Sequence, residues 1–589
     1  MADRRPLTAA LVTVGVLVLS GCAGIPTSGP VHTGAAVVVG QDQPVTQSIA
    51  QPPRPGADPQ HIVQGFIFSS ASFDSDHAVA RQYLTPDVAK SWNPAAGTRI
   101  YQIGPTTGGY KQVAPNEVDL AATQLGEISP QGEYTVARDD ATVSVSFKLR
   151  KVAGEWRISN PPPGLLITAA DRDRVYRAFN VYFPDPTSRV LVPNQILVPV
   201  GPGTFTSLVH AVIAGPTSWL APALHTAVPT GTKLFPDSAP VVNGFVQIQL
   251  TSTAAASSPP DPVTMSAQFV WTLRQLHGLG VNGVAITVGG IPLHIPGVDA
   301  THQSWDSFPQ FDPDGQIPNP TPSAVYATDK GVSLLNAVGG KPLPGPLGEG
   351  PLVLKRPGLS FDERFVAAVD RLGHKLYVTP VTTGIKAPTP VIATATALTA
   401  PSWDRFGDVW TVDQQAKGAV VWLDQPGSPP RQVAAPGLPA GKVLALRVAR
   451  DGVRAVLVVQ KPGGSTAGVY LARIEQRGDP QMSLSGFRPL STPLADVTDV
   501  AWFSSDRLAV LGRQTVGGAQ EPLTVDLSGS LVSTLGPISS ASSSTTVIVS
   551  VTAAPSQEIL VSTSDDKIYR YVGSGWALIT SGSAPSYPG

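Results

Sequence analysis

The sequence predicts a multidomain protein that is mainly β-structure, and three observations support this fold class. The 589 residues include 57 glycines and 59 prolines but only 14% charged residues, a balance typical of chains with many tight turns. Several stretches alternate apolar and polar residues with the period of two that marks a β-strand. The last ~260 residues repeat a strand-bearing unit about every 42 to 54 residues, a period typical of a β-propeller.

Residues 1–21 have the three parts of a secretory signal peptide. Two arginines precede an apolar run over residues 7–19, which is too short for a membrane-spanning helix of about 20 residues. The tetrapeptide LSGC (19–22) then resembles the bacterial lipobox, and Cys22 is the only cysteine in the chain. The resemblance implies cleavage before Cys22 and a mature chain whose Cys22 carries an N-palmitoyl and an S-diacylglycerol group. An ordinary buried cysteine after a signal peptide is the alternative.

Residues 22–56 contain several prolines, few charges and no apolar period, so we expect an extended tether. The domain expected over residues 57–166 begins with a helix, because Asp58 suits the N-cap and Pro59 the first helical position. Four apolar residues then share one helical face: Ile62, Val63, Phe66 and Ile67.

The same domain ends in a predicted β-hairpin with its turn at Ala153-Gly154. Four apolar residues before the turn alternate with polar neighbours: Val143, Val145, Phe147 and Leu149. Helices followed by a curved antiparallel sheet indicate an α+β domain that is similar to the NTF2 superfamily.

Residues 171–297 are expected to form a second domain, of α/β type. Two strands are predicted in FNVYFPDPTSRVLVPNQILVPV (179–200) and a helix in TSLVHAVIAGP (206–216), and Asn243-Gly244 predicts a hairpin turn. A helix followed by a strand is predicted in SAQFVWTLRQLHGLGVNGVAITVGG (266–290). The order of these elements resembles the GerMN domain, which implies a small domain used for protein contacts at bacterial surfaces and no catalytic residue.

Residues 298–322 are polar and proline-rich, so we expect a linker between the second and third domains. The stretch FDPDG (311–315) contains the Asp-x-Asp-Gly pattern that opens some calcium loops. The QIPNPTP that follows has no glutamate to complete such a loop, so we predict a turn instead.

Residues 323–589 are expected to form a β-propeller. Five segments pair a polar turn with an alternating apolar strand: 358–370, 400–413, 446–459, 500–512 and 551–572. At ~43 residues per blade the region would form about six blades. We expect residues 323–335 to supply an early strand and KIYRYVGSGWALI (567–579) to close the ring against it. A pair of β-sandwiches is the alternative.

The chemistry-bearing residues form no recognisable active-site motif. The net charge is −1 and no block of basic residues stands out, so nucleic-acid binding has no electrostatic support. The sequence has no His-Glu-x-x-His, Cys-x-x-Cys, Gly-x-Ser-x-Gly or P-loop motif. We therefore predict a protein that is not an enzyme, with no catalytic residue, cofactor or metal site. His374 lies in the propeller region, where we expect a turn or surface residue.

Two sets of propeller residues keep an alternative function open. Carboxylates at turns are expected to bind backbone N–H groups: Asp362, Asp404, Asp413 and Asp506. Tryptophans are expected in the blade cores, although they could also stack on sugars: Trp403, Trp410, Trp422, Trp502 and Trp576. The alternative is a lipid-anchored hydrolase or carbohydrate-binding protein that uses the propeller channel.

The domain order over the whole chain, together with GCAGIPTSGPV (21–31), resembles the LpqB family of actinobacterial lipoproteins. The resemblance implies a lipid-anchored protein on the extracytoplasmic face of the cell membrane. It also implies an accessory role toward the extracytoplasmic domain of a sensor histidine kinase similar to MtrB, in the MtrAB-LpqB system linked to cell envelope and division.

Overall fold

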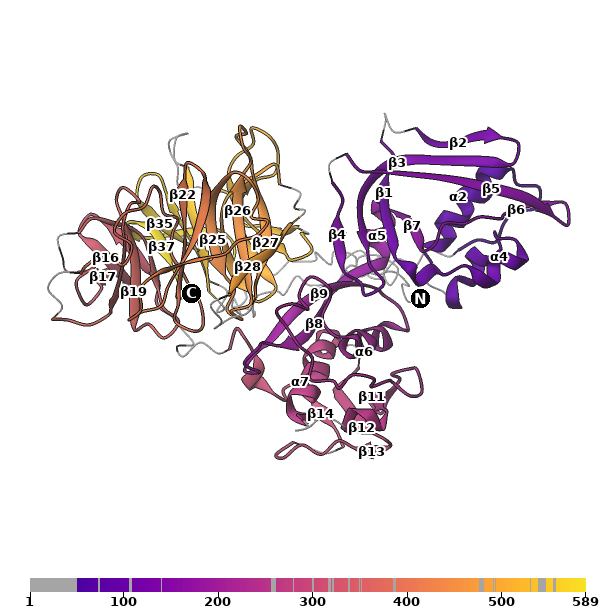
Figure 1. The fold of residues 1–589 in the computed structure, drawn as a ribbon, viewed down its shortest axis with the longest axis horizontal. Helices are drawn as coiled ribbons and strands as arrows, with labels where there is room; N and C mark the ends of the chain where they lie inside the picture. The colour runs from indigo at the N-terminus through magenta and orange to yellow at the C-terminus, as the bar shows by residue number, and fades with distance from the viewer. Residues whose placement is uncertain are drawn as a thin grey trace, which may run out of the picture. The chain divides into compact units, whose positions relative to one another are not determined.

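The computed structural model describes residues 50–589 apart from short gaps, and Figure 1 colours its helices and strands in chain order. The gaps are 73–74, 105–107, 139, 256–260, 279, 299–300, 316–318, 320–321, 337–338, 349, 351, 385–387, 476–480, 491, 493, 530, 539–546 and 555–557. The signal peptide, Cys22 and most of the tether lie outside the described residues. None of the helices within them has the length and apolarity that a membrane crossing requires.

The first domain is α+β, as predicted. Its helices are α2 (Pro59–Ser70), α3 (Ala78–Arg81) and α4 (Pro86–Ser91). Its strands are β1 (Thr98–Gln102), β2 (Gly109–Ala114), β3 (Glu117–Ile128), β4 (Tyr134–Val136), β5 (Thr142–Val152), β6 (Glu155–Ile158) and β7 (Leu165–Thr168). The sheet runs in the order β6-β5-β3-β1-β7, and only the pairing of β1 with β7 is parallel along this path.

The local signals in this domain act as expected. The Asp58 carboxylate accepts a hydrogen bond from the His61 backbone N at 2.9 Å, which caps α2. The apolar face predicted for α2 is at most 4% exposed and packs into the core of the domain. Ala153 and Gly154 have positive φ angles of 50° and 86° and connect β5 to β6, which confirms the predicted hairpin.

The second domain is α/β, as predicted. Its elements are α5 (Ala169–Val175), β8 (Tyr176–Pro184), β9 (Leu191–Pro199), α6 (Thr204–Ala214), β10 (Val241–Val242), β11 (Phe245–Leu250), α7 (Pro262–Leu273), β12 (Gly283–Val288), β13 (Ile291–Pro292) and β14 (Gln303–Ser304). The strands β8 and β9 form a long antiparallel hairpin, whereas β11 and β12 pair in parallel. Asn243 and Gly244 form the predicted two-residue turn with φ angles of 52° and 80°.

Helix α7 begins four residues before the predicted stretch, because Asp261 and Pro262 provide a start signal that the prediction overlooked. The Asp261 carboxylate accepts a hydrogen bond from the Thr264 backbone N, and Pro262 occupies the first turn.

The segment expected to link the second domain to the propeller is partly folded onto the second domain. Its strand β14 pairs with β12, and Phe308 and Phe311 are 4% and 6% exposed. The Trp271 indole N–H donates to the Phe308 carbonyl at 3.1 Å. The aromatic residues among the prolines of this segment therefore serve as core residues.

The described part of the third domain contains six sheets, which confirms the propeller and the expected blade number (Figure 1). The first sheet holds β15 (Val325–Thr328), β16 (Gly331–Asn336), β17 (Gly339–Pro342) and β37 (Ser583–Ser586), and the second holds β18 (Leu354–Leu359), β19 (Phe365–Asp370) and β20 (Leu376–Pro380). The third holds β21 (Ser402–Trp403), β22 (Val409–Gln415), β23 (Gly418–Asp424) and β24 (Arg431–Val433), and the fourth β25 (Lys442–Val448), β26 (Arg454–Gln460), β27 (Ala467–Glu475) and β28 (Ser483–Pro489). The fifth holds β29 (Asp496–Ser504), β30 (Arg507–Arg513), β31 (Glu521–Asp526) and β32 (Leu531–Thr534), and the sixth β33 (Ile548–Ala553), β34 (Ile559–Thr563), β35 (Lys567–Tyr571) and β36 (Trp576–Ser581).

The ring closes with a different strand from the one predicted. β37 pairs antiparallel with β15, so the first blade combines strands from both ends of the domain. The stretch 567–579, which was expected to close the ring, instead forms the two outer strands β35 and β36 of the sixth blade. The short closing strand contains two serines and a proline and shows no apolar alternation, so its partner is set by tertiary pairing rather than by a local pattern.

Candidate functional site

Three of the four carboxylates singled out in the propeller bind turns, as expected. Asp362 accepts from the Arg364 backbone N at 3.1 Å, and Asp413 accepts from the backbone N atoms of residues 396 and 397 at 2.8 and 2.9 Å. Asp404 accepts from the Phe406 backbone N at 2.8 Å and from the Trp410 indole at 2.7 Å. These carboxylates stabilise separate turns and do not converge on one point of the channel.

Three of the five tryptophans are buried, and the histidine lies at a turn. Trp403 and Trp410 have 0% exposed surface and Trp502 has 5%, so the first two have no face available to a sugar. Trp422 and Trp576 are half-buried. His374 is exposed at a turn, where its backbone N donates to Asp370. The alternative of a sugar-binding channel therefore gains no support from Trp403 or Trp410.

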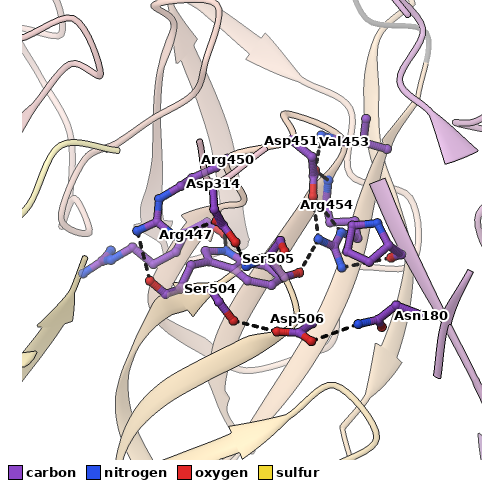
Figure 2. Close-up of polar contacts among 12 residues, drawn as sticks. Asn180, Asp314, Arg447, Arg450, Asp451, Val453, Arg454, Ser504, Ser505 and Asp506 are labelled. Carbon is purple, nitrogen blue, oxygen red and sulfur yellow. Dashed lines mark hydrogen bonds and ion pairs between the residues drawn. The ribbon is translucent and has the colours of Figure 1, made fainter. Parts of the chain in front are cut away.

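A buried ion pair at the turn after β25 is the centre of a network that the sequence analysis missed (Figure 2). The Asp451 Oδ2 atom accepts from the Arg454 Nε and Nη2 atoms at 2.8 and 2.6 Å, and both side chains are at most 1% exposed. Asp451 Oδ1 also accepts from the backbone N atoms of Val453 and Arg454, which fixes the turn. A buried ion pair is costly unless its remaining donors are satisfied.

The remaining Arg454 donors reach two other parts of the chain. Nη1 donates to the Pro193 carbonyl of β9 at 3.2 Å, and Nη2 donates to the Ser505 carbonyl after β29. The guanidinium carbon also lies 5.2 Å from the centre of the Trp502 ring. One arginine therefore connects two blades with the hairpin of the second domain.

Asp506, the fourth carboxylate singled out from the sequence, belongs to this network rather than to a simple turn. It accepts from the Ser504 hydroxyl at 2.6 Å and from the Asn180 side-chain amide of β8 at 2.9 Å (Figure 2). The Trp219 indole N–H of the second domain also donates to the Gly486 carbonyl of β28 at 2.6 Å. Apolar residues of both domains continue into one buried cluster around these contacts.

The FDPDG stretch forms a turn, as predicted, and its second aspartate joins the same network. Asp312 accepts from the Asp314 backbone N at 2.9 Å, which is the expected turn contact. Asp314 then accepts from the Ser505 backbone N at 2.8 Å and lies 3.5 Å from Arg450 Nη1. Burial raises the pKa of Asp314, whereas Arg450 opposes this shift.

This network is suited to holding the second domain and the propeller together, since Pro193, Asn180 and Trp219 of the second domain each bond to a propeller residue. Within the described ranges, Asn180 Oδ1 and Arg450 Nε are buried without a hydrogen-bond partner. In the described ranges, no group of three histidine, cysteine or acidic side chains is placed to hold a metal ion. Asp451 and Asp506 lie in turns that follow inner strands, as do Asp362 and Asp404, so this repeated position predicts a turn carboxylate and does not single out the network. Asn180, Pro193 and Asp314 carry no such signal.

Comparison with known proteins identifies similar domains in the same order. Family models match residues 52–173 (Lipoprotein LpqB, N-terminal domain), 180–294 (Sporulation and spore germination) and 331–588 (Lipoprotein LpqB beta-propeller domain). A protein of Thermobifida fusca named Lipoprotein LpqB is 30% identical and is aligned over 100% of this chain and 99% of its own. One of the same name from Streptomyces coelicolor is 32% identical, over 100% and 98%. A chain from a solved nidogen/laminin complex matches 45% of this chain and 98% of its own at 11% identity, with a TM-score of 0.33.

Proposed function

Because the chain belongs to the LpqB family of actinobacterial lipoproteins, we propose that it is an accessory protein of a two-component sensor histidine kinase of the MtrAB-LpqB type. In this proposal the protein is lipid-anchored on the extracytoplasmic face of the cell membrane. It binds the extracytoplasmic domain of the kinase, modulates signalling linked to cell envelope and division, and catalyses no reaction itself.

With the lipid anchor, even a weak contact with the kinase is sufficient for function. A lipidated Cys22 would hold the protein at the membrane that carries the kinase. Two proteins held on one surface meet at a high effective concentration, so micromolar affinity suffices for association.

The observation that carries the proposal is the buried network that joins the second domain to the propeller. Arg454, Asp506 and Trp219 bind across that contact, and the apolar cluster around them is continuous. A preorganised two-domain scaffold loses little conformational entropy on binding, which suits a protein that presents surfaces to a partner.

The second domain offers exposed apolar residues for such a contact. Phe235 and Ile291 are 75% and 72% exposed, and the strand β10 exposes 42% of Val241 and 48% of Val242. Exposed large apolar side chains occur on all three domains, and these four are the ones that we assign to the kinase contact. They lie on the GerMN-like domain, and resemblance to the GerMN domain implies a role in protein contacts.

The test is direct binding of the full-length protein in detergent to the purified extracytoplasmic domain of the cognate kinase. We expect saturable binding, which Phe235→Ser with Ile291→Ser weakens. The matched control is Val516→Ser with Val572→Ser, which removes apolar residues that are 88% and 56% exposed on the propeller and leaves binding unchanged. No binding at high micromolar concentration, together with unchanged phosphorylation of the response regulator after gene deletion, would contradict the proposal.

A further inference from the structure

The propeller has a cavity of about 320 Å³ at the channel mouth where its inner strands begin. The cavity is lined by the first residues of β18 and β25, by Thr498 of β29 and by the turn at 370–373. Its position at the start of three inner strands makes it part of the central channel rather than a surface groove between loops. A channel mouth is a common place for a ligand site.

Four cations line this cavity: Lys355, Arg356, Arg371 and Lys442. Its one acidic residue, Asp370, accepts from the backbone N atoms of His374 and Lys375 at 2.6 and 2.9 Å. Across the described part of the chain, no ion pair is found for Lys355, Arg371 or Lys442, whose side chains are exposed. The cavity therefore has a positive excess that the protein itself does not neutralise.

Arg356 has an unusual backbone conformation at a β-bulge, and its side chain is hydrogen-bonded to the cavity wall. Its φ is 51°, a costly value for a residue with a side chain, and the pairing of β18 with β19 shifts register at this point. The guanidinium donates to the Leu398 carbonyl of the cavity wall at 3.1 Å. Bulges re-aim side chains and are over-represented at sheet edges and next to active sites, and Arg356 at this one lines the cavity.

Arg447 of the inner strand β25 is paired with Asp499 of β29, so the unpaired positive charge lies at this mouth. Arg447 lies 3.6 Å from Asp499, and burial lowers the pKa of Arg447, with Arg356 close enough to add to the effect. At the other ends of the inner strands, residues 586–589 line a much smaller pocket of about 30 Å³. The Gly589 backbone N donates to the Leu359 carbonyl beside this pocket.

We infer that the open mouth of the propeller is a binding site for a phosphate-bearing small molecule, held by Lys355, Arg356, Arg371 and Lys442. Arginine forms two-point hydrogen bonds with phosphate oxygens, and lysine adds a compact point charge. A volume of about 320 Å³ exceeds that of inorganic phosphate and leaves room for the group that carries it. This site is independent of kinase binding, which we assigned to the second domain.

Calorimetry on the full-length protein in detergent tests the inference, with pyrophosphate as the probe. We expect one site per chain, weaker binding at higher salt, and binding about tenfold weaker or more in Arg371→Gln with Lys442→Gln. The control Lys330→Gln with Lys417→Gln removes the same charge from exposed turns elsewhere on the propeller and should leave binding unchanged.

Two further probes identify the chemistry. Dibutanoyl phosphatidylglycerol, a lipid soluble as a monomer, presents the phosphate as a headgroup. If this lipid binds more tightly than pyrophosphate, and Arg371→Gln with Lys442→Gln abolishes its binding, the natural source of the phosphate is a lipid. Tighter binding of citrate than of both phosphate probes would overturn the assignment to phosphate. If the test and control variants lost the same amount of affinity for pyrophosphate, binding would depend on the overall charge of the propeller and not on a specific site. That result would overturn the inference.

Discussion

Arg454 and Asp451 form a two-point ion pair inside the propeller, with 2.8 and 2.6 Å between the two guanidinium nitrogens and a single carboxylate oxygen. Their side chains are 1% and 0% exposed, so water does not screen the pair. The arginine also donates to two backbone carbonyls, one in the second domain and one in the next blade. The pair therefore stabilises a turn, a blade contact and a domain contact together.

Asp451→Asn should destabilise the propeller by about 3–5 kcal/mol, because it leaves a buried guanidinium without its counter-charge. Denaturant unfolding followed by tryptophan fluorescence measures the change. Adding Arg454→Met to this variant should recover part of the loss, since the double variant removes the uncompensated charge.

The control for this prediction is Arg364→Met. Arg364 forms a 3.7 Å ion pair with Asp362, but the two side chains are 75% and 44% exposed. Exposed pairs contribute ~0–1 kcal/mol, so this change should have little effect. If Asp451→Asn were as mild as Arg364→Met, the buried pair would not be the centre of the network.

Gly582, the residue before the closing strand β37, offers a second test. This residue has a φ of 153°, and a Cβ atom there would lie 2.9 Å from the Ala327 carbonyl oxygen of β15 and still closer to the Tyr326 ring. Gly582→Ala should therefore push β37 away from β15 and destabilise the ring by about 1–3 kcal/mol. Thermal melting of the full chain would show the loss.

Gly575 is the matched control, because a Cβ atom there meets nothing within 4 Å. Gly575→Ala should change stability by no more than about 0.5 kcal/mol. Equal melting curves for Gly582→Ala and the unmodified protein would show that the pairing of β37 with β15 contributes little to closure.

The elements that the sequence predicted well are those set by neighbouring residues. Asp58 caps α2, and Asn243 and Gly244 form the turn between β10 and β11. Both features were predictable because each depends only on contacts within a few residues. The period-two pattern likewise predicted the blades, since it records which face of a strand is buried. These signals are local and can be read without knowledge of the fold.

The network and the closing strand depend on residues far apart in the chain. Asp314 binds Ser505, 191 residues away, and Asn180 binds Asp506, 326 residues away. Nothing in the local pattern of these residues distinguishes them from ordinary turn and strand residues. The cationic mouth was missed for the same reason, because Lys355 and Lys442 become neighbours of one cavity only when the ring closes.

Asp424 predicts a pH dependence of stability. Its side chain is buried at 2% exposure, and neither carboxylate oxygen has a hydrogen-bond partner within the described ranges. Burial, and then the nearby Asp408, raise its pKa to about 6 from an ordinary value of 3.8. The folded state thus binds this proton more tightly than the unfolded state, so the resulting stability is present below about pH 4 and is lost as the pH rises to about 6.

Asp424→Asn should therefore stabilise the protein at pH 7–8 by about 1–3 kcal/mol and flatten the stability profile between pH 4 and 6. Unfolding measured across this pH range, compared with the unmodified protein, gives the difference. Asp329→Asn, which removes a charge from an exposed turn, is the control. A variant profile that runs parallel to that of the unmodified protein would rule out Asp424 as the source.

The last prediction concerns Cys22, which lies outside the described residues. If the lipobox-like LSGC directs acylation, the Cys22 thiol is the only acceptor available for diacylglycerol, since no other cysteine exists in the chain. Cys22→Ser should then abolish incorporation of a clickable fatty acid and release the protein from the membrane fraction. The hydroxyl of serine is close in size to the thiol, so the folded domains, which begin more than 30 residues later, should melt unchanged. Equal labelling of both forms would place the lipid elsewhere or exclude it. Loss of label with full membrane retention would show that another contact holds the protein at the membrane, and the effective-concentration argument for kinase binding would then rest on that contact.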